Sequence, residues 1–272
     1  MTLPRLFKPF QQIHGANMHK LLTEWFKSDL GTQVLQSEKA MLDSLLPSMF
    51  GYYLVQIGVG AAQPLAGAST IHRKLYICEE HFPTEHYQSI VSRPDEIAIA
   101  TESVDVAILH HSLDFESDPH RALREIARTV IPGGKILIVG FNPWSLWGLW
   151  RLFVKQANKI PWSGNFISPF RLSDWLKVLD FHVEGYESMI HGLPTAHSKT
   201  NRFFGWLSYL GQRFWTQRGG VYVLAATKQV STLTPIKPVF RSMRDSLVNI
   251  PIAGIATPST RKRWHLDGKS KS

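Results

Sequence analysis

Short apolar runs separated by polar turns recur along most of this chain, and they predict strands buried on both faces. Each run is four to eight residues long and ends in a glycine, a charged residue or a polar turn, which is the expected length of a core strand. The run at 88–91 is weakly apolar, so a strand there is expected to be short or absent. The strands are predicted at 53–57, 74–78, 88–91, 103–109, 135–139, 181–187 and 220–227.

Apolar residues at helical spacing fill several of the segments between and before these strands. Thr32 is the expected N-cap of the second helix, and Pro47 is expected to end it. Asp118 and Ser173 are the expected caps of two later helices. The helices are predicted at 14–30, 32–46, 119–130, 174–179 and 201–214.

The first strand ends in Gly58-Val59-Gly60, a spacing that favours a tight turn close to a ligand. The segment behind it offers free N–H groups to polar or anionic parts of that ligand. Glu79 follows the second strand, about 20 residues after Gly58 in the sequence. In nucleotide-binding α/β folds an acid at this spacing accepts hydrogen bonds from the ribose hydroxyls. Together these features predict an α/β protein with a nucleotide-type ligand at the end of its first strand.

The block that follows is more specific, because it combines three short motifs in a fixed order. Ser103-Val104-Asp105 opens a strand, Leu123 to Arg128 follows the pattern L-x-E-h-x-R, and Pro132-Gly133-Gly134 precedes the next strand. In this order the chain resembles the class I S-adenosylmethionine-dependent methyltransferases of the small-molecule (type 11-like) branch, within a bacterial subgroup. The resemblance covers residues 50 to 140 closely and 165 to 227 loosely.

The resemblance and the strand pattern together predict a Rossmann-like, seven-stranded, mostly parallel sheet with helices on both faces. The N-terminal helical pair (1–50) is expected to pack on or cap the methyltransferase-like domain (51–230). A basic tail (231–272) is expected to be disordered. At 272 residues, with 44% hydrophobic and 19% charged residues, the chain has the composition of a globular protein.

The family likeness also implies S-adenosylmethionine as cofactor and suggests which residues contact it. Gln56 stands where the family has an acid, and Ala62 where it has a third glycine. Arg93 stands where an acid commonly meets the adenine amine, so Asp95 or Glu96 is the expected substitute. The predicted cofactor-binding residues are Gln56, Gly58, Gly60, Glu79, Asp95, Glu96 and His110.

His110 and His111 follow the fourth strand, at the edge of a parallel sheet where ligands bind. Either could act as a general base near neutral pH, and they are the predicted catalytic residues. The alternative is that a histidine only packs beside the cofactor. A metal shared by the two is not expected, because neighbouring residues on a strand point to opposite faces.

Trp144, Trp147 and Trp150 recur at a spacing of three beyond the fifth strand, which places them along one side of a predicted helix. In the resembling family this region builds the acceptor pocket, so the three tryptophans are the predicted substrate contacts. A core or covering helix, and an interfacial helix touching lipid, remain as alternatives.

The net charge of +9 is concentrated at the end of the chain, where residues 237–272 carry eight Lys or Arg and two Asp. A solvated tail is the simplest interpretation, and peripheral membrane contact stays open. Nucleic-acid binding is not expected, because no nucleic-acid motif accompanies the charge. The absence of an apolar leader in 1–20 and of any long apolar run predicts a cytoplasmic protein without a spanning helix.

The expected activity is methyl transfer from S-adenosylmethionine to a small, apolar or amphipathic acceptor. The alternatives are a catalytically inactive methyltransferase-like binding or scaffold protein and a dinucleotide oxidoreductase, which would share the first strand and turn. Pro132-Gly133-Gly134 speaks against the oxidoreductase. The oligomeric state has no signal in the sequence.

Overall fold

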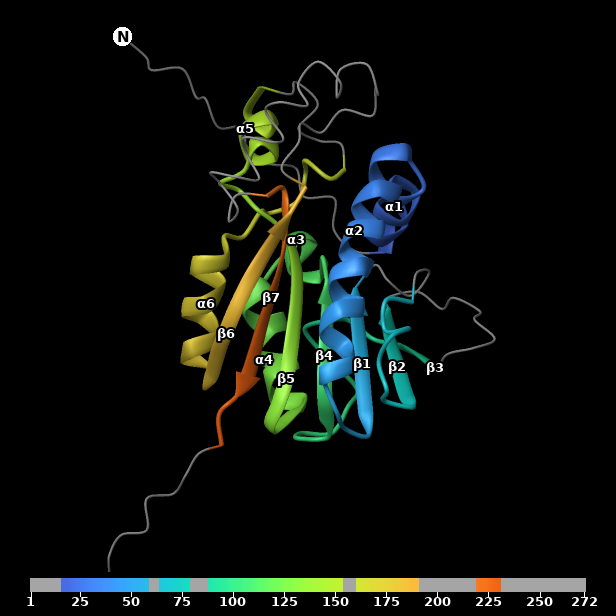
Figure 1. Ribbon diagram of the computed structural model, residues 1–272, viewed down its shortest axis with the longest axis vertical. Helices are drawn as coiled ribbons and strands as arrows, with labels where there is room; N and C mark the ends of the chain where they lie inside the picture. The colour runs from blue at the N-terminus through green and yellow to red at the C-terminus, as the bar shows by residue number, and fades with distance from the viewer. Residues whose placement is uncertain (1–15, 59–63, 79–87, 154–159, 191–218, 231–272) are drawn as a thin grey trace, which may run out of the picture. The chain divides into compact units, whose positions relative to one another are not determined.

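A single seven-stranded sheet organises the computed structural model, which describes residues 16–58, 64–78, 88–153, 160–190 and 219–230. Its strand order is β3-β2-β1-β4-β5-β7-β6, with the first five strands parallel and β7 antiparallel to both neighbours. The predicted mostly parallel, Rossmann-like sheet is therefore confirmed (Figure 1). The strands are β1 Tyr53–Gly58, β2 Arg73–Cys78, β3 Gln88–Val91, β4 Val104–His110, β5 Val130–Phe141, β6 Phe181–Met189 and β7 Val221–Lys228.

Helices cover both faces of the sheet, as the sequence predicts. α1 and α2 pack on one face in a hydrophobic core with residues of β1, β4, β5 and β7, and α4 and α6 pack on the other. In Figure 1, α2 crosses in front of the sheet and α4 lies behind it. The helices are α1 Ala16–Phe26, α2 Asp29–Leu45, the 3₁₀ turn η1 Leu46–Ser48, α3 Ser112–Phe115, α4 Pro119–Thr129, α5 Leu146–Phe153 and α6 Pro169–Val178.

Two predicted helix starts lie too late in the sequence. The Ser28 side chain, not that of Thr32, caps α2 by accepting a hydrogen bond from the N–H of Gly31. Ser168, not Ser173, caps α6, and Pro169 is its first residue. In both cases a serine directly before the helix satisfies a free N–H that the later residue cannot reach. The predicted cap of α4 by Asp118 is confirmed.

The connection from β1 to β2 explains why the N-terminal helices are needed on this face. Residues 64–72, the described part of that connection, form turns and no helix. Leu65, Ala66 and Ile71 are buried in the same core as α1 and α2. Pro64 and Gly67 disfavour a helix here, as the sequence indicates. The face that a crossover helix covers in other parallel sheets is thus filled by the N-terminal pair.

Asp105 on β4 fixes the start of β1. Its Oδ2 accepts hydrogen bonds of 2.9 Å from the N–H groups of both Tyr52 and Tyr53. We expect Asp105→Ala to lower the free energy of unfolding by about 2 kcal/mol, since both bonds are to a charged group. Urea unfolding should show this loss, whereas Asp174→Ala, at an exposed site, should be close to neutral. Equal stability of the two variants would contradict this role.

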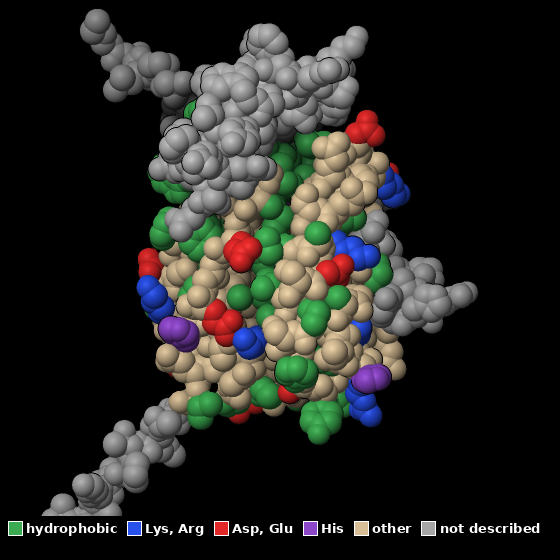
Figure 2. Space-filling view, in the orientation of Figure 1, with side chains coloured by type: hydrophobic (Ala, Val, Ile, Leu, Met, Phe, Trp, Pro, Cys, Tyr) green, Lys and Arg blue, Asp and Glu red, His purple; other side chains and the backbone are tan. Residues whose placement is uncertain are grey.

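The visible surface carries no broad patch of one charge in the described part. Figure 2 shows acidic and basic side chains scattered singly or beside one another. No helix among the described residues is long and apolar enough to span a bilayer. The predicted helix at 201–214 and the basic tail at 231–272 lie outside the described residues, so those predictions stay as they are.

Candidate active site at the carboxyl ends of β1 and β4

Gly58 and His110 are paired neighbours at the carboxyl ends of β1 and β4. Gly58 has a φ of +112°, and a Cβ added there would lie 2.2 Å from the carbonyl oxygen of His110. This positive φ is one that glycine adopts readily. The close approach that demands glycine is to the neighbouring strand of the chain itself, so the two strand ends are held tightly together.

Both predicted histidines reach one buried carboxylate, that of Glu38 on α2. The Nε2 atom of His110 lies 2.9 Å from Glu38 Oε2, and that of His111 lies 2.8 Å from Glu38 Oε1. The expectation that the two rings point to opposite faces is wrong, because β4 ends at His110 and His111 has a φ of +51°. That left-handed residue turns the chain and brings the second ring back to the same side.

The hydrogen-bonded chain continues from His111 to the short helix α3. Asp114 Oδ2 lies 2.9 Å from His111 Nδ1 and accepts a 3.0 Å hydrogen bond from the N–H of Phe141. The result is a linear array, Asp114–His111–Glu38–His110, that joins α3, β4 and α2. Phe26 stacks on the ring of His110, and Phe141 stacks on that of His111.

All four members of this array are buried, so burial and the contacts among them both shift their pKa values. Burial alone would raise the pKa of Glu38, but the two histidines outweigh it and hold that pKa at about 2. Burial alone would lower the pKa of His111, but Glu38 and Asp114 raise it to about 9. Burial lowers the pKa of His110 despite its contact with Glu38. At neutral pH, Glu38 is thus an anion, His111 a cation and His110 neutral.

The raised pKa of His111 predicts a loss of stability at alkaline pH. Its stabilising contribution is complete below the ordinary value of 6.5 and is lost as the pH rises through about 9. We expect the free energy of unfolding to fall by about 3 kcal/mol over this window. Denaturant titrations at several pH values should show the fall in the wild type and a smaller one in His111→Gln. A wild-type stability that stays constant or rises over the window would contradict the assigned charge.

Two buried polar atoms at this edge have no hydrogen-bond partner in the described part of the chain: His110 Nδ1 and Ser112 Oγ. The Cβ of Ser112 lies 3.2 Å from the position that a Cβ on Gly58 would take. A buried polar atom left unpaired costs about 1–3 kcal/mol, so a bound ligand that satisfies it is favoured. This edge therefore fits a polar cofactor or acceptor group.

Three other predicted cofactor residues are Gln56, Gly60 and Glu79. Gln56 is buried, and its Oε1 accepts a hydrogen bond from the N–H of Leu65, so it holds the chain after β1. Gly60 and Glu79 lie outside the described residues. Cofactor contacts by these three residues stay predictions.

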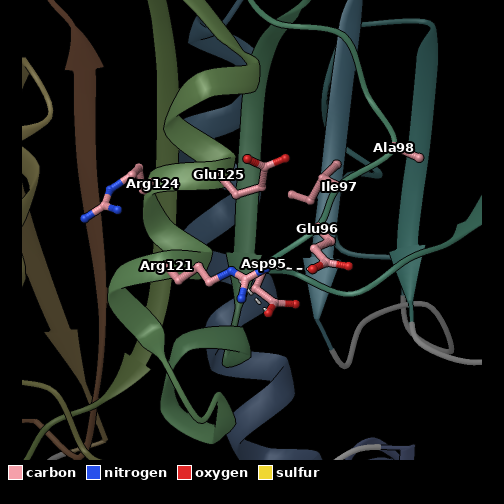
Figure 3. A pocket seen from close by; sticks show the side chains of 7 residues that line it. All are labelled: Asp95, Glu96, Ile97, Ala98, Arg121, Arg124 and Glu125. Carbon is pink, nitrogen blue, oxygen red and sulfur yellow. Dashed lines mark hydrogen bonds and ion pairs between the residues drawn. The ribbon is translucent and has the colours of Figure 1, made fainter.

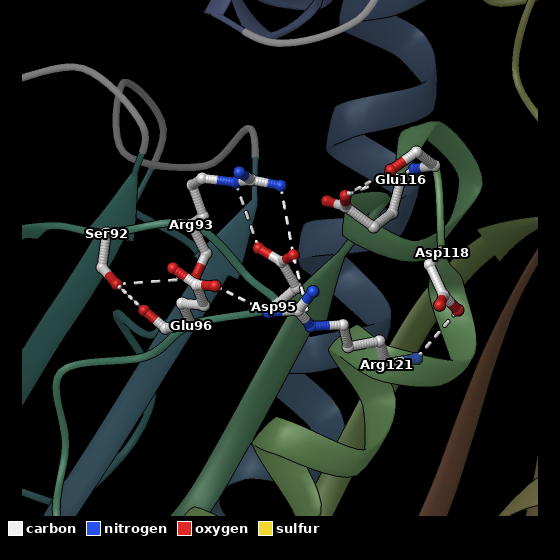
Figure 4. Close-up of polar contacts among 8 residues, drawn as sticks. Ser92, Arg93, Asp95, Glu96, Glu116, Asp118 and Arg121 are labelled. Atoms are coloured by element: carbon white, nitrogen blue, oxygen red, sulfur yellow. Dashed lines mark hydrogen bonds and ion pairs between the residues drawn. The ribbon is translucent and has the colours of Figure 1, made fainter.

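Asp95 and Glu96 line a shallow pocket beside the first turns of α4 (Figure 3). Asp95 forms an ion pair with Arg93, whose Nε lies 3.1 Å from Oδ1 and whose Nη2 lies 3.1 Å from Oδ2. Glu96 forms a 2.6 Å ion pair with Nη2 of Arg121. Figure 4 shows Asp95 between the two arginines. An adenine contact by Asp95 or Glu96 stays a prediction. The carboxylate that makes it would bind the adenine and its arginine partner at the same time.

The three predicted substrate tryptophans occupy different environments. α5 begins at Leu146, so Trp144 precedes the helix and the three do not lie along one helical stripe as expected. Trp147 is fully buried against Phe141 and Trp162, whereas Trp144 is 71% and Trp150 37% exposed. Phe141 joins this aromatic group to His111, because its ring lies 4.1 Å from the imidazole.

Glu38 is the site residue that the sequence prediction omits. It occupies the buried stripe of α2 between Val34 and Leu42, at a spacing of four from each. A buried glutamate has to be paired, so a glutamate within an apolar stripe indicates a polar partner in the core. This was the signal in the sequence that could have identified Glu38. Its partners, however, are more than seventy residues away in sequence, and no local sequence pattern identifies them.

Comparison with known proteins agrees with this fold. The model of the family described as "Methyltransferase domain" matches residues 55–138, which span β1 to β5. The chain is also 30% identical over 170 residues to the uncharacterized protein YafS of Escherichia coli K12, covering 62% of this chain and 69% of that one.

The chain belongs to the class I S-adenosylmethionine-dependent methyltransferases. A demethylmenaquinone methyltransferase from Chlamydia pneumoniae is 27% identical to it over 134 residues, covering 43% of this methyltransferase and 57% of that one. A Thermotoga maritima structure described as an S-adenosylmethionine-dependent methyltransferase, possible histamine N-methyltransferase, has the same fold. It is 21% identical with a TM-score of 0.55, covering 78% of this chain and 98% of that one. The comparisons give no support to an inactive binding protein.

Proposed function

We propose that this methyltransferase uses the carboxyl ends of β1 and β4 to methylate a small, apolar or amphipathic acceptor. S-adenosylmethionine, when bound, supplies an electrophilic methyl group on a sulfonium centre. We assign Gly58, Ser112 and His110 to hold it or the acceptor beside it. The protein's task is then to orient the acceptor and to exclude water, an effect that can contribute about 7–11 kcal/mol to a bimolecular reaction.

The observation that carries the proposed acceptor class is the aromatic group beside His111. Rings of Phe141, Trp147, Trp162 and Phe166 lie in successive contact, with centroid distances of 5.1–6.5 Å. Trp144 and Trp150 are the partly exposed tryptophans next to this group in sequence. The exposed rings of Trp144 and Trp150 favour an apolar body over a fully polar metabolite. The relative named a demethylmenaquinone methyltransferase, an enzyme named for a largely apolar quinone, supports only the apolar character of the acceptor.

The test is a methyl-transfer assay with isotopically labelled S-adenosylmethionine and paired acceptors of equal nucleophilicity, one apolar and one bearing a sulfonate. We expect labelled product from the apolar member alone. Trp144→Ala and Trp150→Ala should raise the KM for that acceptor about tenfold without changing cofactor affinity, a loss of about 1.4 kcal/mol.

Phe50→Ala is the matched control. Phe50 is 77% exposed but precedes β1, at the opposite edge of the sheet from the site. Its replacement should leave the KM for the acceptor and the affinity for the cofactor unchanged. A preference for the sulfonated acceptor would refute the proposed acceptor class.

A further inference from the structure

Glu38 sets the tautomer of His110. An ionised carboxylate only accepts hydrogen bonds, so at 2.9 Å from Glu38 Oε2 the Nε2 of His110 must carry the proton. A neutral imidazole has one N–H, which leaves Nδ1 as a lone-pair acceptor. That atom is buried and has no partner among the described residues. It is therefore a base shielded from bulk water at the carboxyl end of a central parallel strand, the edge where open α/β sheets bind ligands.

The geometry points to a general-base pair: His110 Nδ1 removes a proton from the acceptor, and Glu38 is the residue that positions and polarises His110. This inference rests on the proposed function and makes it more specific. The methylated atom is then a heteroatom that carries a proton, in a hydroxyl, phenol or amine group. An acceptor without such a proton, such as a thioether or a tertiary amine, would not need this pair.

The reaction balances with the groups named. The acceptor's heteroatom forms a bond to the methyl carbon as the sulfur–carbon bond breaks, and that electron pair stays on sulfur. The proton of the heteroatom goes to His110 Nδ1, giving an imidazolium whose charge Glu38 stabilises. This is the arrangement in which a carboxylate orients a catalytic histidine in hydrolytic triads.

Other charged groups around the array are consistent with this assignment. His111 lies between Glu38 and Asp114 and carries the resident positive charge. Arg151 on α5 and Tyr222 on β7 are the further titratable groups that Asp114 influences. The Tyr222 hydroxyl donates to the carbonyl oxygen of Ile167, and burial keeps its pKa raised. His110 is therefore the neutral member of the array that can gain a proton.

A metal ion is the competing explanation, because Glu38, His110 and His111 offer ligand atoms within 4.8 Å of one another. Zinc bonds of about 2.0–2.1 Å would hold tetrahedral ligand atoms about 3.3 Å apart. The observed separations of 2.8 and 2.9 Å are instead those of direct hydrogen bonds. The array as described is held by hydrogen bonds, and a zinc ion would have to move its ligand atoms apart.

The first test uses nitrogen-15 NMR of the histidine side chains in the full-length wild type. We expect His110 to be neutral and protonated at Nε2, and its Nδ1 resonance to move when S-adenosylhomocysteine and phenol are added together. A His110 protonated at Nδ1, or one equivalent of zinc in the purified protein by mass spectrometry, would overturn the inference. Because this readout needs no variant, it stands even if substitutions at Glu38 unfold the chain.

The second test compares Glu38→Gln with Glu24→Gln, an exposed carboxylate paired with Lys27. We expect Glu38→Gln to lower kcat about 100-fold for an acceptor with an O–H or N–H group, to shift its pH profile, and to leave affinity for S-adenosylhomocysteine within threefold. Glu24→Gln should match the wild type, and Glu38→Asp should restore part of the rate. An unchanged kcat and pH profile in Glu38→Gln would refute the pair. Failure of the wild type to bind S-adenosylhomocysteine would instead refute the proposed function.

Discussion

Glu38→Ala is expected to lower the free energy of unfolding by about 3–5 kcal/mol, the usual cost of removing one partner from a buried ion pair. The substitution leaves the His111 cation without its main counter-charge and leaves the Nε2–H groups of both histidines without their acceptor. It also removes the polar link between α2 and the end of β4, because Glu38 is the α2 residue that contacts both rings. Typical domains have only about 5–15 kcal/mol of stability, so the variant should unfold at a much lower denaturant concentration.

Glu24→Ala provides the comparison, since Glu24 is 59% exposed and pairs with Lys27 on the surface of α1. Exposed pairs contribute about 1 kcal/mol or less. Urea unfolding followed by far-ultraviolet circular dichroism measures both variants. If Glu38→Ala were as mild as Glu24→Ala, the buried array would not hold α2 on the sheet.

Gly58→Ala is expected to be strongly destabilising, for two separate reasons. An alanine at φ +112° is strained, which costs about 1–3 kcal/mol. Its Cβ would also lie 2.2 Å from the carbonyl oxygen of His110, so β1 and β4 would have to separate. Overpacking of this kind adds about 1–3 kcal/mol and shifts the atoms that line the site.

Gly67→Ala is the matched control, because a Cβ there has no atom within 4 Å and its φ is not positive. It should leave stability and cofactor affinity nearly unchanged. Thermal unfolding and titration with S-adenosylhomocysteine report on the two properties separately. A Gly58→Ala variant that matches Gly67→Ala in both would show that the strand ends are not packed as described.

The fold was predictable because its signals are local. Buried strands such as β1 and β4 are continuous apolar runs, and the motif around Pro132 to Gly134 has a fixed place between α4 and the core of β5. Helix caps were predicted less well, because serine, threonine and aspartate are all suitable capping residues. Which of them caps a helix depends on where the backbone enters the helical conformation, and the sequence does not show that point. Ser28 in place of Thr32 and Ser168 in place of Ser173 are examples.

The site was predictable only in part, because it depends on contacts between distant segments. The position of His110 and His111 at a strand end follows from the sheet alone. Their common partner does not follow from it, since Glu38 lies on a helix that precedes the first strand. The left-handed conformation of His111 was also not predictable, because no glycine marks that position in the sequence. The different exposures of Trp144 and Trp147 likewise depend on where α5 begins.

Calorimetric titration of the full-length chain with S-adenosylmethionine tests the central claim most directly, that the ends of β1 and β4 hold this cofactor. We predict one binding site per chain with a micromolar Kd in the wild type and a loss of at least about tenfold in affinity for Gly58→Ala, with Gly67→Ala unchanged. Absence of binding heat in the wild type at millimolar ligand, or equal affinity in Gly58→Ala and the wild type, would contradict it.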